Sequence, residues 1–523
     1  MRWRSTLLLT AAVAAAGCSA SDDDVTKTSA EPTPTTTVEA SDPGGETTST
    51  EPAAPAEPSS EIDVDAFDPG PFAWEPFNDA VDVATLEVPV DWADPDGPRF
   101  ELFVARYNAQ DQENKIGSLL VNPGGPGSEG TFLALSASRI YDQEILRNFD
   151  IIAWDPRGTG ESDPPIDCID DYDPYFTAID STPEDETERQ ELIDASRAFA
   201  EACVEHNEYL EYVGTNNSAR DMDAIRRALG EDTISYFGFS YGSELGAAWA
   251  TLFPDTVRAA VLDGAADPDA DELESSLQQL AGFEASLETF LAQCSADPEC
   301  AFHNGGDAEG AFDVLMASLD EDPIPPGDPS RPPVNRDVAT TAVIEAMYSD
   351  VRWPALAESL AAAQAGDGAG LMALHDSYYQ RLPDGTYDNF LEAFPVISCA
   401  DNPQRRTVEE IDADSPRYTE VAPRLVPEGS LGGYTCTFMP PAVDPRVDIT
   451  GAGAGTILVI GTTGDPSTPL DSTTRMANAL EDSRLLIVEA EQHTGYGVNR
   501  CVVDAVNRYL VDLEPPEDGL RCG

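Results

Sequence analysis

The chain has very few basic residues. It contains only two lysines, Lys27 and Lys115, and its 29 basic residues stand against 97 acidic ones, for a formal net charge of −68 over 523 residues. Nucleic-acid binding needs clustered cations that replace the counterions of the phosphates, and docking on anionic lipid needs them too. We therefore expect no nucleic-acid partner and no electrostatic attachment to a membrane surface.

Long apolar runs are also scarce. The longest lies at residues 7–16, after Arg2 and Arg4 and before Gly17 and Cys18. This run is too short to span a bilayer as a helix, whereas a basic start followed by such a run is typical of an export signal. The residues before Cys18 resemble a bacterial lipoprotein processing site. We expect residues 1–18 to be a signal peptide and Cys18 to be lipidated, which would place the protein on the outer face of the cytoplasmic membrane. The alternative is secretion with Cys18 removed.

Residues 19–60 have almost no large apolar side chains. Ser, Thr, Pro, Glu and Ala make up most of this segment. Such a composition cannot bury enough apolar surface to fold. We expect a disordered linker that keeps the following domain clear of the membrane.

The chain has no Cys-x-x-Cys motif and no Cys/His group with zinc spacing, so we expect no metal. Besides Cys18 it has eight cysteines, and an even number in an exported protein indicates disulfides. Proximity along the chain favours two bonds, and two more would complete the set. The favoured pairs are Cys294–Cys300 and Cys501–Cys522, and the completing pairs are Cys168–Cys203 and Cys399–Cys436.

Eight short runs of apolar and β-branched residues predict strands. The first two look like an antiparallel pair joined by an Asp-Pro-Asp-Gly turn. The later runs lack clean alternation, which is typical of strands covered on both faces, and helical patterns between them favour a mostly parallel sheet. The runs lie at 86–90, 100–107, 118–121, 150–154, 234–239, 257–262, 456–460 and 485–488.

The alternation of strands and helices stops between residues 267 and 440. Helical patterns fill this region, and buried-strand runs are absent from its sequence. We predict a mainly helical cap at 267–440, inserted after the sixth strand of an α/β domain. The core of that domain would then consist of residues 61–266 and 441–523.

A Gly-x-Ser-x-Gly motif at 238–242 follows one of the predicted strands and opens a helix. In this context the turn is so sharp that Gly238 and Gly242 avoid clashes, and the serine is exposed at the positive end of the helix. Without the flanking elements the motif would be a weak signal. With them, Ser240 is the predicted nucleophile.

A nucleophilic serine needs a base and an acid, in the chain order Ser, acid, His. Of the four histidines, only His493 follows the last predicted strands in a glycine-containing loop, so we predict His493 as the base. Two carboxylates compete for the third position. We favour Asp465, which follows the strand at 456–460 and is biased toward extended geometry by Pro466. The alternative is Asp263, which follows the strand at 257–262.

Acyl transfer also requires N–H donors for the oxyanion of the tetrahedral intermediate. An Asn-Pro-Gly-Gly-Pro-Gly loop at 122–127 directly follows a predicted strand. We expect the amides of Gly125 and Tyr241 to form the oxyanion hole. A phosphate-binding loop is excluded because prolines remove donors and no lysine follows, and no cofactor is expected.

The sequence contains five motifs that occur together and in a fixed order over nearly all of residues 75–523. The set resembles secreted bacterial tripeptidyl aminopeptidases, relatives of proline iminopeptidases in the α/β-hydrolase superfamily. The resemblance implies an α/β-hydrolase fold with a mostly parallel eight-stranded sheet and a cap after strand six. It implies that Asp465 is the acid of the triad. It also implies that the second motif has a structural role, with Asp155 and Arg157 tying a turn. The motifs are Gly-Gly-Pro-Gly (124–127), Asp-Pro-Arg-Gly-Thr-Gly-Glu-Ser (155–162), Gly-x-Ser-Tyr-Gly (238–242), Leu-Asp-Gly (262–264) and Asp-Pro-Ser-Thr-Pro (465–469).

The resemblance implies an exported serine exopeptidase that cleaves peptides near their free N-terminus through an acyl-enzyme. The alternatives are a carboxylesterase of the same fold and a non-catalytic surface lipoprotein. An aminopeptidase must also bind a free ammonium group, for which a carboxylate near the cap is suited. The candidates are Glu244, Asp350 and Asp401. Glu244 stands where the family is expected to have an uncharged residue.

Overall fold

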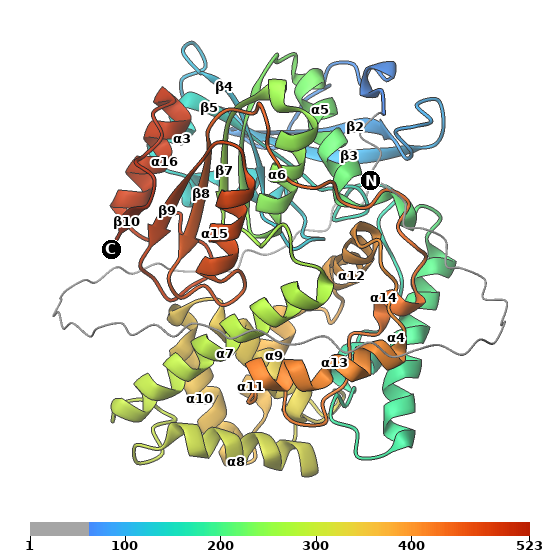
Figure 1. Ribbon diagram of the computed structural model, residues 1–523, viewed down its shortest axis with the longest axis vertical. Helices are drawn as coiled ribbons and strands as arrows, with labels where there is room; N and C mark the ends of the chain where they lie inside the picture. Colours follow the sequence, from blue (N-terminus) through green and yellow to red (C-terminus); the bar gives the residue numbers. More distant parts are fainter. Residues whose placement is uncertain (1–61) are drawn as a thin grey trace, which may run out of the picture. The chain divides into compact units, whose positions relative to one another are not determined.

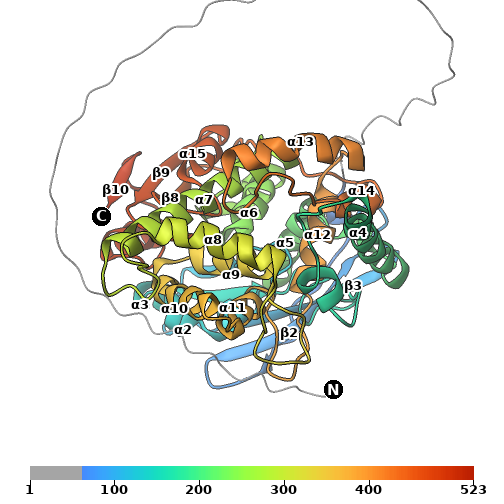
Figure 2. The same cartoon turned by 90° about the horizontal axis from the view of Figure 1, so that it is seen from below.

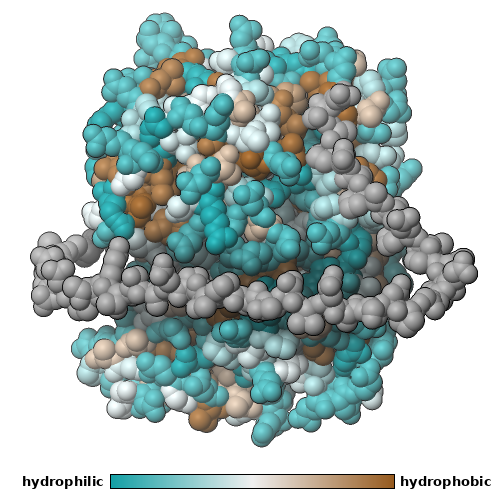
Figure 3. All heavy atoms as spheres, in the orientation of Figure 1, coloured by the Kyte–Doolittle hydropathy of each residue, from teal (hydrophilic) through white to brown (hydrophobic). Residues whose placement is uncertain are grey.

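The structure is a computed structural model that describes residues 62–523, so the predicted signal peptide, Cys18 and the linker lie outside the described residues. No helix within residues 62–523 has both the length and the apolar character needed to cross a membrane. Hydrophilic residues cover much of the face seen in Figure 3, as expected for a chain with this excess of acidic residues.

One sheet runs through the described residues in the order β1-β2-β3-β5-β4-β6-β7-β8-β9-β10 (Figure 1). β2 and β3 are antiparallel, β3 joins β5 antiparallel, and the strands from β5 to β10 in that order are parallel. The strands are β1 Glu75–Pro76, β2 Val81–Pro89, β3 Arg99–Tyr107, β4 Gly117–Asn122, β5 Phe149–Trp154, β6 Ile234–Phe239, β7 Val257–Asp263, β8 Ile457–Thr462, β9 Ser483–Val488 and β10 Leu520–Cys522.

The predicted mostly parallel sheet is therefore present, and its eight predicted strands all occur. The predicted number of strands was too low, because the sheet also has the short edge strands β1 and β10. Two or three residues cannot leave a recognisable apolar pattern. These strands add hydrogen bonds at the edges and carry no part of the predicted site.

Helices cover both faces of the sheet and fill the region between β7 and β8. The helices outside that region are α1 Phe132–Leu135, α2 Ala137–Ile140, α3 Gln143–Asn148, α4 Glu186–His206, α5 Thr215–Leu229, α6 Tyr241–Leu252, α15 Leu470–Ala479 and α16 Arg500–Asp512. Those between β7 and β8 are α7 Glu272–Ala296, α8 Ala308–Glu321, α9 Arg336–Met347, α10 Trp353–Gln364, α11 Ala369–Tyr378, α12 Phe390–Asp401, α13 Val408–Val421 and α14 Thr435–Phe438.

Alternate strand residues face two separate apolar cores. One core joins the sheet to α5, α6 and α15, for example through Tyr236, Trp249 and Met476. The other joins it to α1, α2, α3 and α16, for example through Phe237 and Val506. Tyr236 and Phe237 are neighbours on β6 and lie in different cores, which explains why such a strand does not alternate between apolar and polar residues.

The helices α7 to α11 share a core of their own. Leu287 of α7, Phe312 of α8, Val343 of α9 and Leu360 of α10 are fully buried in it. Figure 2 shows α8 to α11 grouped together. An independent core of this kind lets the region fold as a helical layer without contributing strands to the sheet.

A segment between β5 and β6 packs on the inserted helices, which the sequence did not predict. Leu192 and Ile193 of α4 share a small core with Ile411 of α13 and Tyr434. In the same segment Asp173, at the start of the short helix Asp173–Thr177, forms an ion pair with Arg331. The helical region is thus built from two parts of the chain.

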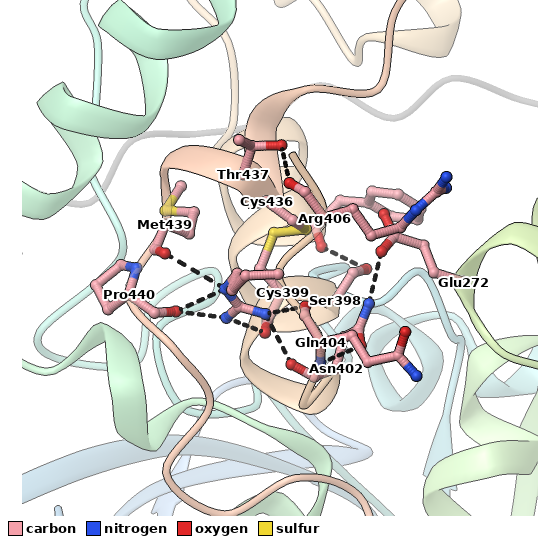
Figure 4. The surroundings of a disulfide bond; sticks show 12 residues. Glu272, Ser398, Cys399, Asn402, Gln404, Arg406, Cys436, Thr437, Met439 and Pro440 are labelled. Atoms are coloured by element: carbon pink, nitrogen blue, oxygen red, sulfur yellow. Dashed lines mark hydrogen bonds between the residues drawn. A yellow bond between two sulfur atoms is a disulfide. The ribbon is translucent and has the colours of Figure 1, made fainter. Parts of the chain in front are cut away.

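Four disulfides join the same cysteines that were paired from the sequence. They are Cys168–Cys203, Cys294–Cys300, Cys399–Cys436 and Cys501–Cys522. The last ties the start of α16 to β10 at the edge of the sheet. The Cys399–Cys436 bond links the end of α12 to α14 (Figure 4).

The 155–162 motif is structural, although Asp155 and Arg157 act separately. Arg157 is fully buried and forms a bidentate ion pair with Asp221 of α5, at 2.6 and 2.7 Å. It also donates to the carbonyl groups of Pro89, Val90 and Tyr212. Asp155 instead accepts from the backbone amides at 130, 131 and 161. Asp155 therefore ties the turn, as expected, through the Glu161 amide. The expectation for Arg157 is corrected, because its side chain bonds to other segments of the chain.

Candidate active site

The predicted nucleophile lies at a strained turn between β6 and α6. Ser240 has φ 55° and ψ −127°, a conformation that L-residues rarely adopt. A methyl group on Gly238 would lie 2.1 Å from the carbonyl oxygen of Gly242, and one on Gly242 would lie 2.8 Å from that of Asn122. Both positions therefore require glycine, and the turn presents Ser240 at the first turn of a helix.

His493 and Asp465 lie in loops that follow β9 and β8. His493 Nδ1 lies 2.8 Å from Asp465 Oδ1 and 3.0 Å from Oδ2. The buried carboxylate also accepts backbone N–H groups from Ser467, Thr468 and Thr494. These donors hold the carboxylate in place, so that Asp465 can orient the imidazole.

The segment that pairs with Ser240 also lies against the imidazole of His493. The Ser240 amide donates to the carbonyl oxygen of Asp263 at 2.8 Å, and a methyl group on the next residue, Gly264, would lie 3.0 Å from His493 Cε1. His493 Nε2 is buried and has no hydrogen-bond partner among residues 62–523. The nitrogen opposite Asp465 is thus available to receive a proton.

The alternative acid, Asp263, has a different place. Its two oxygens accept the amides of Gly495 and Tyr496, each at 2.7 Å. Burial raises the pKa of Asp263 to about 7, with the Asp465 charge adding to the rise, while the two amides and His493 oppose it. Asp263 holds the loop that carries His493 and makes no hydrogen bond to the imidazole itself.

The pKa of His493 gives a prediction about the pH dependence of activity. Burial lowers this pKa, but the charge and hydrogen bond of Asp465 and the charge of Asp263 outweigh burial, so the pKa lies above the ordinary value of 6.5. A base must be neutral, so we expect the acid limb of kcat/KM to have its midpoint above 6.5. The chain has only four histidines, so NMR titration of Ser240→Ala can show whether the acid limb of kcat/KM follows the protonation of His493. A His493 midpoint below 6.5 would contradict this expectation.

The predicted oxyanion loop lies against the nucleophile. A methyl group on Gly124 would lie 2.8 Å from Ser240 Cβ and 3.1 Å from the Tyr241 amide nitrogen. Tyr241 is the first residue of α6, so its amide has no acceptor within the helix. Gly125, with φ 113°, comes next in the same loop. The structure therefore places the glycine loop, at Gly124, against Ser240 and the Tyr241 amide.

The three carboxylates considered for the substrate ammonium have different surroundings. Glu244 forms an ion pair with Arg446 at 2.9 Å. Asp401 accepts two hydrogen bonds from Thr215, and burial raises its pKa to about 7. Asp350 is exposed, and its backbone amide donates to the carbonyl oxygen of Glu491, two residues before His493. Among the described residues no cation pairs with Asp350.

Two contacts to His493 were not predicted. Thr468 Oγ1 lies 3.4 Å from Nδ1, and the carbonyl oxygen of Tyr348, just after α9, accepts the His493 amide at 2.9 Å. Thr468 belongs to the 465–469 motif, which was the available signal, whereas nothing in the sequence marks Tyr348. Residues 62–523 contain no group of three or more His, Cys, Asp or Glu side chains arranged to hold a metal ion.

Comparison with known families gives two matches. Residues 117–304 match the α/β-hydrolase fold family, and residues 428–522 match the family described as TAP-like protein. Together the two matches cover more than half of the chain and include Ser240, Asp465 and His493.

Three relatives align with most of the chain. Serine protease Hip1 of Mycobacterium tuberculosis is 34% identical over 84% of this chain and 86% of its own. Carboxylesterase B of the same organism is 38% identical with the same coverage. A tripeptidyl aminopeptidase of Streptomyces coelicolor is 29% identical over 82% of this chain and 80% of its own. The chain therefore belongs to the α/β-hydrolase superfamily, in the tripeptidyl aminopeptidase family, and it is a serine hydrolase.

Proposed function

We propose that this protein is an exported serine exopeptidase that hydrolyses peptide bonds near the free N-terminus of peptides. The observation that carries the proposal is the hydrogen bond between His493 and Asp465, at the carboxyl ends of the strands where the half-buried Ser240 lies. Relatives named as a serine protease and a tripeptidyl aminopeptidase support peptides as the substrates.

In the proposed mechanism Ser240 attacks the peptide carbonyl while His493 Nε2 takes its proton. The amides of Gly125 and Tyr241 stabilise the oxyanion, and His493 then protonates the leaving amine. Asp465 keeps the proton on Nδ1 and stabilises the imidazolium. Water releases the acyl group by the same steps, with His493 again as the base.

A carboxylesterase is the second candidate, because the relative with 38% identity is named Carboxylesterase B. A direct test offers the purified protein one tripeptide amide in free and N-acetylated forms, together with a short-chain ester. We expect the free amide to be cleaved best and Ser240→Ala to reduce turnover to background. Ester cleavage without amide cleavage would replace the peptidase proposal with the esterase, and full amide turnover by Ser240→Ala would contradict both.

We propose Asp350 as the residue that binds the substrate ammonium, since Glu244 and Asp401 already have partners in the free protein. Asp350→Asn is expected to raise KM for the free tripeptide amide by roughly 3- to 10-fold, the worth of a partly exposed ion pair. KM for the N-acetylated substrate should not change. Glu358→Gln, an exposed acid on α10, is the matched control. An equal rise in KM for both substrates would count against Asp350.

Export and lipidation at Cys18 complete the proposal and rest on the sequence of residues 1–18. The predicted attachment is an N-terminal lipid followed by the polar segment 19–60. This arrangement would leave the catalytic domain free to meet peptides outside the cytoplasm.

A further inference from the structure

Helix α12 contacts both sides of the predicted oxyanion hole. At its first turns it lies against the glycine loop, because a methyl group on Gly127 would lie 2.9 Å from the Phe394 amide and 3.0 Å from the Phe390 carbonyl oxygen. A methyl group on Gly125 would lie 3.2 Å from the Phe390 ring. The loop carrying the first predicted donor is thus packed directly on α12.

The last residue of the same helix reaches the second donor through a chain of hydrogen bonds. Asp401 Oδ1 accepts the Thr215 amide and Oδ2 accepts the Thr215 hydroxyl, both at 2.6 Å. Thr215 Oγ1 in turn lies 2.5 Å from Tyr241 Oη. When Asp401 is ionised, the threonine gives its only hydroxyl proton to the carboxylate, so Tyr241 is then the donor to Thr215. The bonds therefore run from Tyr241 through Thr215 to Asp401.

The end of α12 is well anchored. Cys399, two residues before Asp401, forms the disulfide with Cys436 (Figure 4). Arg405 donates to the carbonyl groups of Cys399, Met439 and Pro440. The amide of Arg446 donates to the Asp401 carbonyl. Asp401 is therefore a fixed point against which a neighbouring side chain can be positioned.

We propose that Asp401 is a positioning residue of the oxyanion hole: through Thr215 it fixes Tyr241, so that the amide of Tyr241 faces the reacting carbonyl. The inserted helices, through α12, thereby hold both donors in position relative to Ser240. This inference rests on the proposed function, since it assumes acyl transfer at Ser240. It also gives Asp401 a role other than binding the substrate ammonium.

The proposal predicts an effect on the transition state rather than on substrate binding. The oxyanion forms only as Ser240 attacks, so a misplaced donor lowers kcat and leaves KM unchanged. Thr215→Val keeps the shape of the side chain and removes the hydroxyl. We expect it to lower kcat by roughly 10- to 100-fold, less than the complete loss of a donor. Thr215→Ser, which keeps the hydroxyl, should restore most of the activity.

Three further measurements separate positioning from a general loss of structure. Tyr241→Phe and Asp401→Asn should each lower kcat, and combining either with Thr215→Val should cost little more than the single change, because all three act through one chain of bonds. A peptide aldehyde, which forms a tetrahedral adduct with the serine, should bind more weakly by the same factor that kcat/KM falls. Binding of the non-reactive peptide product should stay unchanged.

Asp337 provides a matched control. It lies in the first turn of α9 and accepts hydrogen bonds from the amide and the hydroxyl of Ser181 at 2.9 and 2.5 Å. Asp401 binds Thr215 in the same arrangement. Asp337→Asn should leave kcat and aldehyde affinity at wild-type values, and thermal melts of every variant report whether it folds. Wild-type kcat and aldehyde affinity in folded Thr215→Val would overturn the proposal. So would a rise in KM alone in Asp401→Asn, which would make Asp401 a substrate-binding residue. Activity retained in Ser240→Ala would instead overturn the proposed function itself.

Discussion

Asp465→Asn is expected to lower kcat/KM by about 10⁴-fold, the effect of removing the acid from a Ser-His-Asp triad while leaving its shape. The asparagine would offer an amide group to His493 Nδ1, where the carboxylate now accepts at 2.8 Å. The imidazole would then take the wrong tautomer or turn away, and its charged form would lose its partner. Steady-state kinetics on the free tripeptide amide measure the effect.

The matched variant is Asp263→Asn, because Asp263 was the competing acid. In the structure it accepts the amides of Gly495 and Tyr496, and an asparagine could accept only one of them well. One unsatisfied amide costs about 1–3 kcal/mol, so we expect activity to fall by at most about 100-fold. A larger loss in Asp263→Asn than in Asp465→Asn would reverse the assignment of the acid.

Arg157→Met is expected to reduce the free energy of unfolding by about 3–5 kcal/mol, the cost of leaving one buried charge without its partner. Asp221 would keep its burial and lose two hydrogen bonds from the guanidinium, and the carbonyl groups of Pro89, Val90 and Tyr212 would lose their donor. Because Arg157 joins the end of β2 to α5, the substitution should lower the stability of the sheet. Urea unfolding followed by circular dichroism measures it.

The comparison is Arg484→Met, which breaks a surface ion pair with Asp482 in which both side chains are more than one-third exposed. Solvent screens such a pair, so the change should be less than about 1 kcal/mol. A similar loss in both variants would show that Arg157 contributes no more than a surface charge.

The main strands and the predicted site residues could be read from the sequence because each depends on a local pattern. β6 is apolar at successive positions, and Gly238 and Gly242 flank Ser240 at fixed spacing. His493 could be found by elimination among four histidines. The residues favoured Asp465 over Asp263, because Pro466 biases Asp465 toward extended geometry. Both follow a buried strand, however, and the fold shows which carboxylate meets the imidazole.

Features that depend on distant pairing were not predicted. The contact of α4 with α13 joins segments more than 200 residues apart. The chain from Tyr241 through Thr215 to Asp401 uses three common polar residues with no shared motif. Neither leaves a periodic signal, because a hydrogen bond across the fold constrains one residue at each end and not a run of residues.

The order of the chain also fixes when activity can begin. Ser240 is made before the inserted helices, whereas Asp465 and His493 follow β8 and β9, which come after them. A nascent chain that ends within the helices has its serine without a base or an acid. The proposed triad can therefore be complete only after nearly all of the chain has been made.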